Sequence, residues 1–263
     1  MFSNTFAEKE MMKLAKPSTI LFSAAVLLVL PCLASAYPLG TVEIVNTGNA
    51  ASEAVTIWGG GQEGLDVYAG VYTFKKTAGT GEGKLWDNGT ISGFCTELNE
   101  TVPQITSKYT VMALEDGPVP TSFLGGPMGE AKADYVRELW GRFYDPSWAA
   151  DGQFTWYQNS QASAFAAAIW EIVYENLPAS PSKWDVKVDG SWGSLGFRSE
   201  WVDATTANNW LHALDGTGPK ADLRIFSFDG SQDYIAEVPE PATIVLLGFG
   251  GALSLLRRKR KVA

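Results

Sequence analysis

The C-terminus of this 263-residue chain most constrains how it can fold, because three physically different segments follow one another there: a proline-rich motif, an apolar run and a basic cluster. The run spans Ile244 to Leu256 and lies between a proline-rich motif and five consecutive basic residues. A helix of thirteen residues is about 20 Å long, whereas the apolar layer of a bilayer is about 30 Å thick. Basic side chains can extend a short span by reaching the lipid headgroups. The run therefore predicts a short, temporary transmembrane anchor.

The N-terminus has the pattern of an export signal. Lys13 and Lys16 supply positive charge, and an apolar stretch follows over residues 19–30. Ala34 and Ala36 form an A-x-A cleavage site, so we predict that the mature chain begins at Tyr37.

The segments around the apolar run give it an orientation. Pro239, Glu240 and Pro241 precede it, and the two prolines keep this motif extended, which suits a protease cleft. By the positive-inside rule, the basic cluster stays in the cytoplasm as a membrane stop, so the preceding domain lies outside. The residues of this stop are Arg257, Arg258, Lys259, Arg260 and Lys261.

This three-part tail, over residues 238–261, resembles the PEP-CTERM sorting signal of Gram-negative bacteria. The resemblance implies an exosortase substrate: a membrane protease-transpeptidase of that family would act at the Pro-Glu-Pro motif. It also implies passage through the export machinery and transient anchorage at the inner membrane. Delivery to the cell surface or extracellular matrix would follow. The alternative is an ordinary C-terminal membrane anchor.

These assignments divide the chain into an N-terminal extension and signal peptide (1–36), an exported domain (37–237) and the sorting signal (238–263). Residues 37–238 contain 12 basic and 26 acidic residues, a formal net charge of −14, against −9 for the whole chain. Such a surface repels nucleic acid and anionic lipid, and we expect no nucleic-acid partner. An exopolysaccharide bridged by cations remains a candidate partner.

The exported domain must be stabilised by its core alone. Cys32 leaves with the signal peptide, so Cys95 is the single cysteine and cannot form an intramolecular disulfide. The chain contains 10 Trp, 13 Phe and 9 Tyr, which is ample material for a core.

The first half of the domain has the pattern of strands separated by glycine- and asparagine-rich turns. Asn88-Gly89 is a hairpin signal, and Asp229-Gly230 predicts a turn between two closing strands. Residues Asn46 to Asn49 predict a further turn. The predicted strands cover residues 41–45, 54–58, 65–74, 89–95, 108–114, 222–228 and 233–238.

Helical periodicity begins at about Lys132, and we predict helices over residues 133–143, 160–176 and 201–214. The central helix places its apolar residues at helical spacing on one face. The order of elements predicts an α+β fold: a mainly antiparallel β-sandwich or barrel-like domain with an inserted helical portion. A signal peptide and a transmembrane sorting helix flank this domain.

Two short motifs are similar to parts of the thioester domains of surface adhesins. Cys95 ends a predicted strand, and Ala168-Ile169-Trp170 lies on the central helix. In those domains a cysteine bonds to a glutamine on the helix, and the electrophilic thioester can acylate an amine. The resemblance implies a vestigial thioester region at Cys95, Ala166 and Trp170, because Ala166 stands at the glutamine position and has no carboxamide. A buried free thiol is the alternative.

Other motifs predict no catalytic residue, cofactor or metal. Residues 59–64 fit G-x-G-x-x-G, but a predicted strand follows them where a dinucleotide site needs a helix. Glu171 and Glu175 share a helix face and predict a solvated or cation-binding edge. His212 is the single histidine, and no G-x-S-x-G motif supplies a nucleophile. The aspartates of 185–189 and 229–233 are typical of turns.

We therefore expect a non-enzymatic, surface-sorted structural or adhesive component of the envelope or exopolysaccharide matrix. Two alternatives remain. One is a carbohydrate-binding module that uses exposed tryptophans, such as Trp148 or Trp192 on predicted loops. The other is a thioester adhesin built on Cys95.

Overall fold

The computed structural model of the protein describes residues 37–119, 127–190 and 196–240. The predicted signal peptide, with Ala34 and Ala36, lies outside these residues. Pro241, the apolar run and the basic cluster 257–261 also lie outside them. In the part of the chain that is described, no helix is long and apolar enough to cross a membrane.

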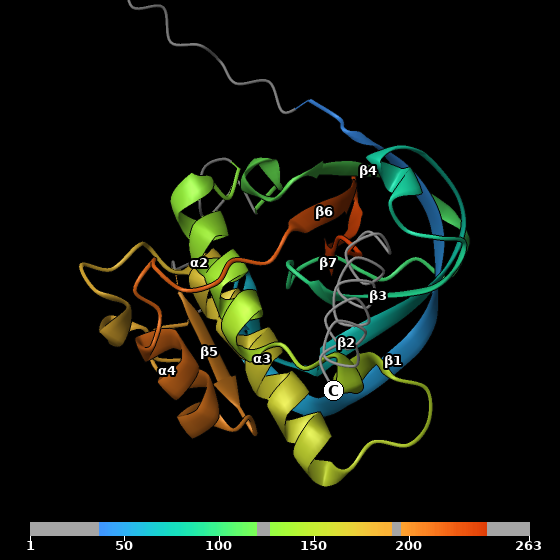
Figure 1. The fold of residues 1–263 in the computed structure, drawn as a ribbon. Helices are drawn as coiled ribbons and strands as arrows, with labels where there is room; N and C mark the ends of the chain where they lie inside the picture. Colours follow the sequence, from blue (N-terminus) through green and yellow to red (C-terminus); the bar gives the residue numbers. More distant parts are fainter. Residues whose placement is uncertain (1–36, 120–126, 191–195, 241–263) are drawn as a thin grey trace, which may run out of the picture. The chain divides into compact units, whose positions relative to one another are not determined.

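Seven strands of the described chain form one antiparallel sheet, in the order β2-β3-β7-β6-β4-β1-β5. β2 also pairs with β1, so the sheet closes on itself and forms the barrel in Figure 1. The short β5 extends it beside the second half of β1. The strands are β1 (Gly40–Gly59), β2 (Gln62–Gly81), β3 (Gly89–Cys95), β4 (Ser107–Ala113), β5 (Phe197–Glu200), β6 (Leu223–Phe228) and β7 (Ser231–Glu237).

β1 is one strand of 20 residues, so the prediction of two strands separated by a turn at residues 46–49 was wrong. The turn-forming residues lie within the strand, where the register of its pairing with β2 shifts. These shifts occur between Asn46 and Gly48 and again between Asn49 and Ser52. Bulges of this kind bend a strand without ending it. The length of β1 lets its first half pair with β4 and its second half with β5.

The β1–β2 hairpin turns at Gly60 and Gly61, whose φ angles are 58° and 86°. Positive φ at both positions is typical of the turns that join twisted strands, and glycine adopts it freely. Because β2 follows directly, the G-x-G-x-x-G residues form a hairpin and not a dinucleotide site, as predicted. β2 and β3 pair as antiparallel neighbours, as the hairpin signal predicted, but the turn is not at Asn88-Gly89. β2 ends at Gly81, and Asn88 accepts a 2.9 Å hydrogen bond from Lys76 Nζ beside the start of β3.

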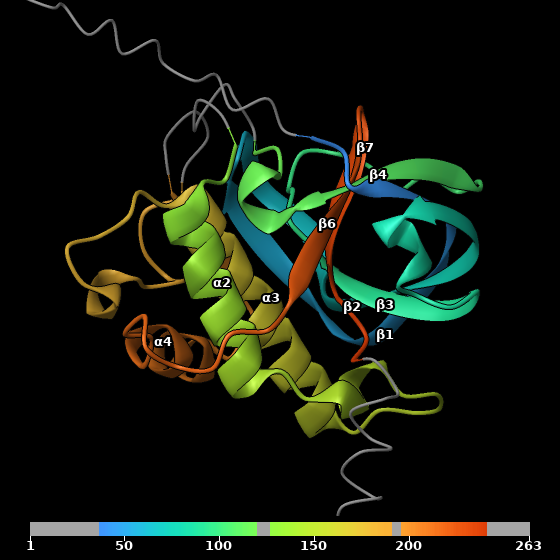
Figure 2. The same ribbon diagram turned by 45° about the horizontal axis from the view of Figure 1, so that its top comes forward.

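Three α-helices of the described residues are inserted between β4 and β6: α2 (Glu130–Phe143), α3 (Trp156–Tyr174) and α4 (Ala204–His212). Figure 2 shows α2 and α3 side by side, next to the closed sheet. The inserted helical portion and the closing β6–β7 hairpin confirm the α+β prediction.

Local capping explains why two helix starts differ from the prediction. Thr155 and Gln158 form a capping box, which begins α3 four residues early. Asp203 accepts a hydrogen bond from the Thr206 amide and begins α4 three residues late. The residues before Asp203 include β5, which the sequence did not predict.

From Ala162 to Tyr174, α3 is buried on all sides, because this part lies between the sheet and the other helices. The prediction of one apolar face was therefore wrong. Its alanines allow close packing on every side. Phe165 lies at the centre of an aromatic cluster in contact with Phe94, Trp140, Tyr144, Trp148 and Trp210. A second aromatic cluster links strands of the barrel through Tyr72, Phe74, Tyr109 and Tyr234.

Candidate functional site

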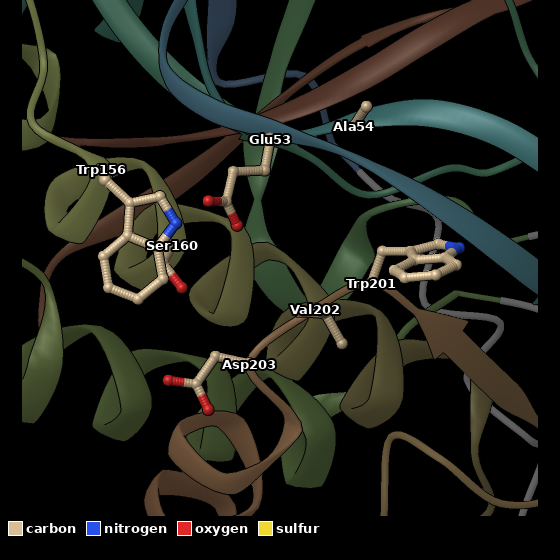
Figure 3. Close-up of a pocket in the computed structure, with 7 residues that line it drawn as sticks. All are labelled: Glu53, Ala54, Trp156, Ser160, Trp201, Val202 and Asp203. Atoms are coloured by element: carbon tan, nitrogen blue, oxygen red, sulfur yellow. The ribbon is translucent and has the colours of Figure 1, made fainter.

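A pocket of about 570 Å³ opens where β1, the first turn of α3 and the β5–α4 connection meet. Figure 3 shows Glu53 extending from β1 between two indole rings, with Asp203 across the pocket from it. Trp156 is the first residue of α3, and Trp201 directly follows β5. Helix capping fixes two sides of the pocket, because Thr155 is the N-cap of α3 and Asp203 is the N-cap of α4.

Both tryptophans of this pocket are exposed. Trp156 keeps 77% of its surface accessible and Trp201 78%. Trp201 also has a φ of 67°, a conformation that bulky residues rarely adopt and that costs about 1–3 kcal/mol. The rest of the fold therefore holds an apolar side chain in solvent against an energetic cost, which is typical of functional positions.

The polar groups of the pocket are acidic or neutral. The pKa of Glu53 is raised by burial and by the nearby Asp203 carboxylate. Asp203 accepts hydrogen bonds from the Thr206 amide at 3.0 Å and the Thr206 hydroxyl at 2.7 Å. Among the described residues, no lysine or arginine pairs with either carboxylate. The site thus combines negative charge with aromatic surface.

The tryptophans that line this pocket are not the ones that the sequence suggested for carbohydrate binding. Trp148 is 3% exposed and packs in the aromatic cluster around Phe165, so its candidacy was wrong. Trp192 lies outside the described residues. Trp156 and Trp201 are 45 positions apart, and no spacing signal in the sequence connects them.

The start of the C-terminal tail is held firmly by the domain. Trp86 Nε1 donates a 2.9 Å hydrogen bond to the Glu237 carbonyl, and Trp140 Nε1 donates one of 3.0 Å to the Glu237 carboxylate. The Val238 amide bonds to the Asp222 carbonyl at 2.8 Å. Pro239 and Glu240 follow and are exposed. The chain therefore leaves the domain at a fixed point, with Pro239 and Glu240 accessible.

Comparison with known families gives one match in this region. The model described as the PEP-CTERM protein-sorting motif matches residues 237–261. The chain carries a PEP-CTERM sorting signal. This signal supports export and sorting to the cell surface or extracellular space, with processing by exosortase, a membrane protease.

The PEP-CTERM match covers only the tail and says nothing of the domain before it. No curated protein and no solved structure matches the chain. The activity of the exported domain must therefore be argued from its own residues.

The fold brings two of the three thioester-region residues together. Trp170 Nε1 donates a 3.0 Å hydrogen bond to the Cys95 carbonyl. The Cys95 thiol is 1% exposed and donates to the Glu97 carbonyl at 2.8 Å. Burial raises the pKa of this thiol far above its usual range, which makes it a poor nucleophile.

Ala166 is buried in α3 and offers only a methyl group. The Gln161 amide points elsewhere, toward the Thr206 hydroxyl at 3.5 Å. A buried carboxamide that the sequence reasoning missed is Gln232, whose Nε2 donates to the Glu97 carbonyl at 3.1 Å, the same oxygen that accepts from Cys95. Gln232 lies on β7, more than 130 residues from Cys95, so only the strand pairing reveals this proximity.

The remaining candidates have structural partners. Glu171 is 2% exposed and accepts from the Asp185 amide at 2.8 Å, so the predicted solvated edge was wrong. Glu175 accepts from the Phe197 amide at 3.1 Å. His212 Nε2 donates to the Trp184 carbonyl at 2.8 Å. Among the described residues, no group of three or more His, Cys, Asp or Glu is arranged to hold a metal ion.

Proposed function

We propose that the mature chain is a non-enzymatic structural or adhesive component of the bacterial envelope or exopolysaccharide matrix. In this proposal, exosortase releases it from a transient inner-membrane anchorage by acting at the motif that begins at Pro239. The observation that carries the proposal is the position of the sorting motif: its first residues, Pro239 and Glu240, are exposed just after a strand fixed through Glu237.

The geometry of the tail supports processing in the folded state. The hydrogen bonds of Trp86 and Trp140 tie Glu237 to the domain, so the domain stays folded up to the residue before Val238. A protease needs an extended, accessible segment, and Pro239 keeps the backbone extended in solvent. Cleavage there leaves the paired strand β7 and the core intact.

The non-enzymatic assignment is supported by the partners of the residues that a hydrolase would use. His212 bonds to a backbone carbonyl, and Glu171 and Glu175 accept backbone amides of other segments. A general acid or base needs access to substrate. These three side chains instead fix the fold around α3 and α4.

Mass spectrometry of both termini of the protein recovered from the medium and the envelope of its host tests the sorting route. We expect the recovered chain to begin at Tyr37 and to lack Leu256 and the basic cluster. Replacing Pro239 and Pro241 with alanine makes the motif compatible with a helix, and this variant should accumulate in the membrane with its tail intact. Pro178→Ala, in the loop after α3, is the matched control and should be sorted normally. A released wild-type chain that still carries Leu256 would contradict the proposal.

A further inference from the structure

We propose that the pocket lined by Trp156, Trp201, Glu53 and Asp203 binds a glycan that carries protonated amino groups, an amino-sugar polymer of the matrix. The inference rests on the proposed matrix role and names the chemical class of its partner. It goes beyond the sorting signal, because the pocket belongs entirely to the exported domain.

The aromatic surface provides the first part of the argument. Trp156 and Trp201 lie on opposite sides of Glu53 in Figure 3, each with more than three quarters of its surface exposed. Indole faces bind the apolar faces of sugar rings, and they attract cations within about 6 Å by 0.5–2 kcal/mol. Isolated exposed tryptophans are uncommon because burial of a large aromatic side chain is favourable. Two of them on one pocket indicate a ligand that covers them.

The charge of the pocket selects among glycans. Glu53 and Asp203 are close enough for the negative charge of Asp203 to raise the pKa of Glu53. Among the described residues neither carboxylate has a basic partner within ion-pair distance, so a bound ammonium group would supply the missing charge. The domain as a whole carries a net charge of −14, so uronic acids and sulfated sugars are repelled.

Ser160 adds a neutral polar group to the pocket. It lies one turn after Trp156 on α3 and lines the pocket. Its hydroxyl can donate or accept a hydrogen bond and is therefore placed to bind a ligand hydroxyl or amine.

The size of the pocket agrees with a sugar ligand. Its volume of about 570 Å³ lies within the range of about 300–1,000 Å³ that small-ligand sites occupy. Both indoles at the pocket are more than three quarters exposed, so a polymer can reach them at any point along its length.

The test is calorimetric titration of the full chain, solubilised in a detergent without a sugar headgroup, in mildly acidic buffer. The three probes are a glucosamine oligomer, its N-acetylated counterpart and an oligouronate of the same length. We expect the glucosamine oligomer to bind, the acetylated one to bind at least about tenfold more weakly because it has lost its charge, and the oligouronate not to bind.

Variants connect binding to the pocket. Trp156→Ala and Trp201→Ala should each weaken glucosamine-oligomer binding about threefold to thirtyfold. Tyr157→Ala is the matched control, because Tyr157 is a 64% exposed aromatic residue beside Trp156 that does not line the pocket. Glu53→Gln should weaken binding, whereas Glu63→Gln on the exposed part of β2 should not. Far-ultraviolet circular dichroism checks that each variant is folded.

Three outcomes would overturn the inference: no binding of the glucosamine oligomer, equal binding of all three probes, or unchanged binding in both tryptophan variants. None of these affects the sorting proposal, which is tested on the termini of the native protein. A chain that is cleaved and released normally but binds no amino sugar refutes the pocket alone.

Discussion

The indole of Trp170 donates its hydrogen bond to the carbonyl oxygen of Cys95, at 3.0 Å, and so joins the C-terminal part of α3 to the end of β3. Both residues are buried, Trp170 at 2% exposure. This bond lies where the inserted helices meet the closed sheet.

Replacing Trp170 with phenylalanine should destabilise the fold by about 1–3 kcal/mol, because the Cys95 carbonyl loses a partner in a buried position. Urea unfolding of the full chain in non-ionic detergent measures the change as a lower midpoint with an unchanged slope. Trp156→Phe is the control, since an exposed substitution is expected to change stability by less than about 0.5 kcal/mol. Equal midpoints for Trp170→Phe and wild type would show that the bond is not needed for stability.

Cys95 should be a free thiol that is protected by burial. Its Sγ is held by the Glu97 carbonyl, and Ala166 offers no carboxamide for a thioester. We expect no alkylation of the folded protein, complete alkylation in denaturant, and an intact mass without the loss of one ammonia. Protection in the folded state alone does not distinguish a thiol from a thioester, so the mass decides. A missing ammonia would point to the neighbouring Gln232 carboxamide and would restore the thioester adhesin.

The sequence predicted elements well where one local signal dominates. The Asp229-Gly230 turn predicted the β6–β7 hairpin, and helical periodicity predicted α3, whereas the caps Thr155 and Asp203 that set the starts of α3 and α4 were missed. It failed at Asn46 and at Asn88, where turn-forming residues occupy a bulge and a strand start. Turn propensity is local, whereas the pairing of β1 with β2, β4 and β5 is set by contacts distant in sequence.

The candidate pocket could not be predicted for the same reason. The sequence marks the second half of the chain as rich in tryptophan, but it does not distinguish the buried Trp148 from the exposed Trp156. Their exposures follow from packing around Phe165 and from the position of the α3 N-terminus. The sorting motif was predictable because its three parts are contiguous and each acts through composition alone.

Stability should fall as the pH rises from mildly acidic to alkaline. Burial, then the charges of Glu175, Asp185 and Asp189, raise the pKa of Glu171 to about 9. The pKa of Glu97 is raised to about 8, also chiefly by burial. These carboxyl groups stay protonated in the folded state above the pH at which they ionise in the unfolded chain. The folded state then binds more protons, so the free energy of unfolding decreases between about pH 4.5 and pH 9.

Thermal unfolding of the full chain across this pH range measures the effect. Glu171→Gln resembles the protonated acid and keeps an acceptor for the Asp185 amide. Its melting temperature should therefore depend less on pH than that of wild type, and the difference should be greatest above pH 8. Glu63→Gln, at an exposed position, should follow the wild-type curve. Parallel curves for Glu171→Gln and wild type would show that Glu171 is ionised in the folded protein.

Among the carboxylates of the helical portion, Glu138 should be the one whose replacement destabilises the fold most. It is fully buried on α2, where it accepts from Arg142 Nε at 2.8 Å. It also accepts from the Gly216 amide at 2.7 Å and the Gly218 amide at 3.1 Å. Glu138→Ala removes all of these bonds and leaves Arg142 Nε and the loop amides without their acceptor, while Arg142 keeps its ion pair with Asp215, so we expect a loss of about 3–5 kcal/mol.

The urea midpoint of Glu138→Gln should lie between those of Glu138→Ala and wild type. The amide oxygen of glutamine still accepts hydrogen bonds, but its NH₂ group faces a backbone N–H donor and cannot accept from it. Glu130→Gln, exposed in the first turn of the same helix, should cost no more than about 1 kcal/mol through the helix dipole. The 215–218 loop leads directly into β6, which pairs with β7 and so with the strand that carries Glu237. Loss of the Glu138 bonds should therefore also increase hydrogen exchange of the β6 amides. Unchanged β6 exchange in Glu138→Ala would show that the loop is positioned by other contacts.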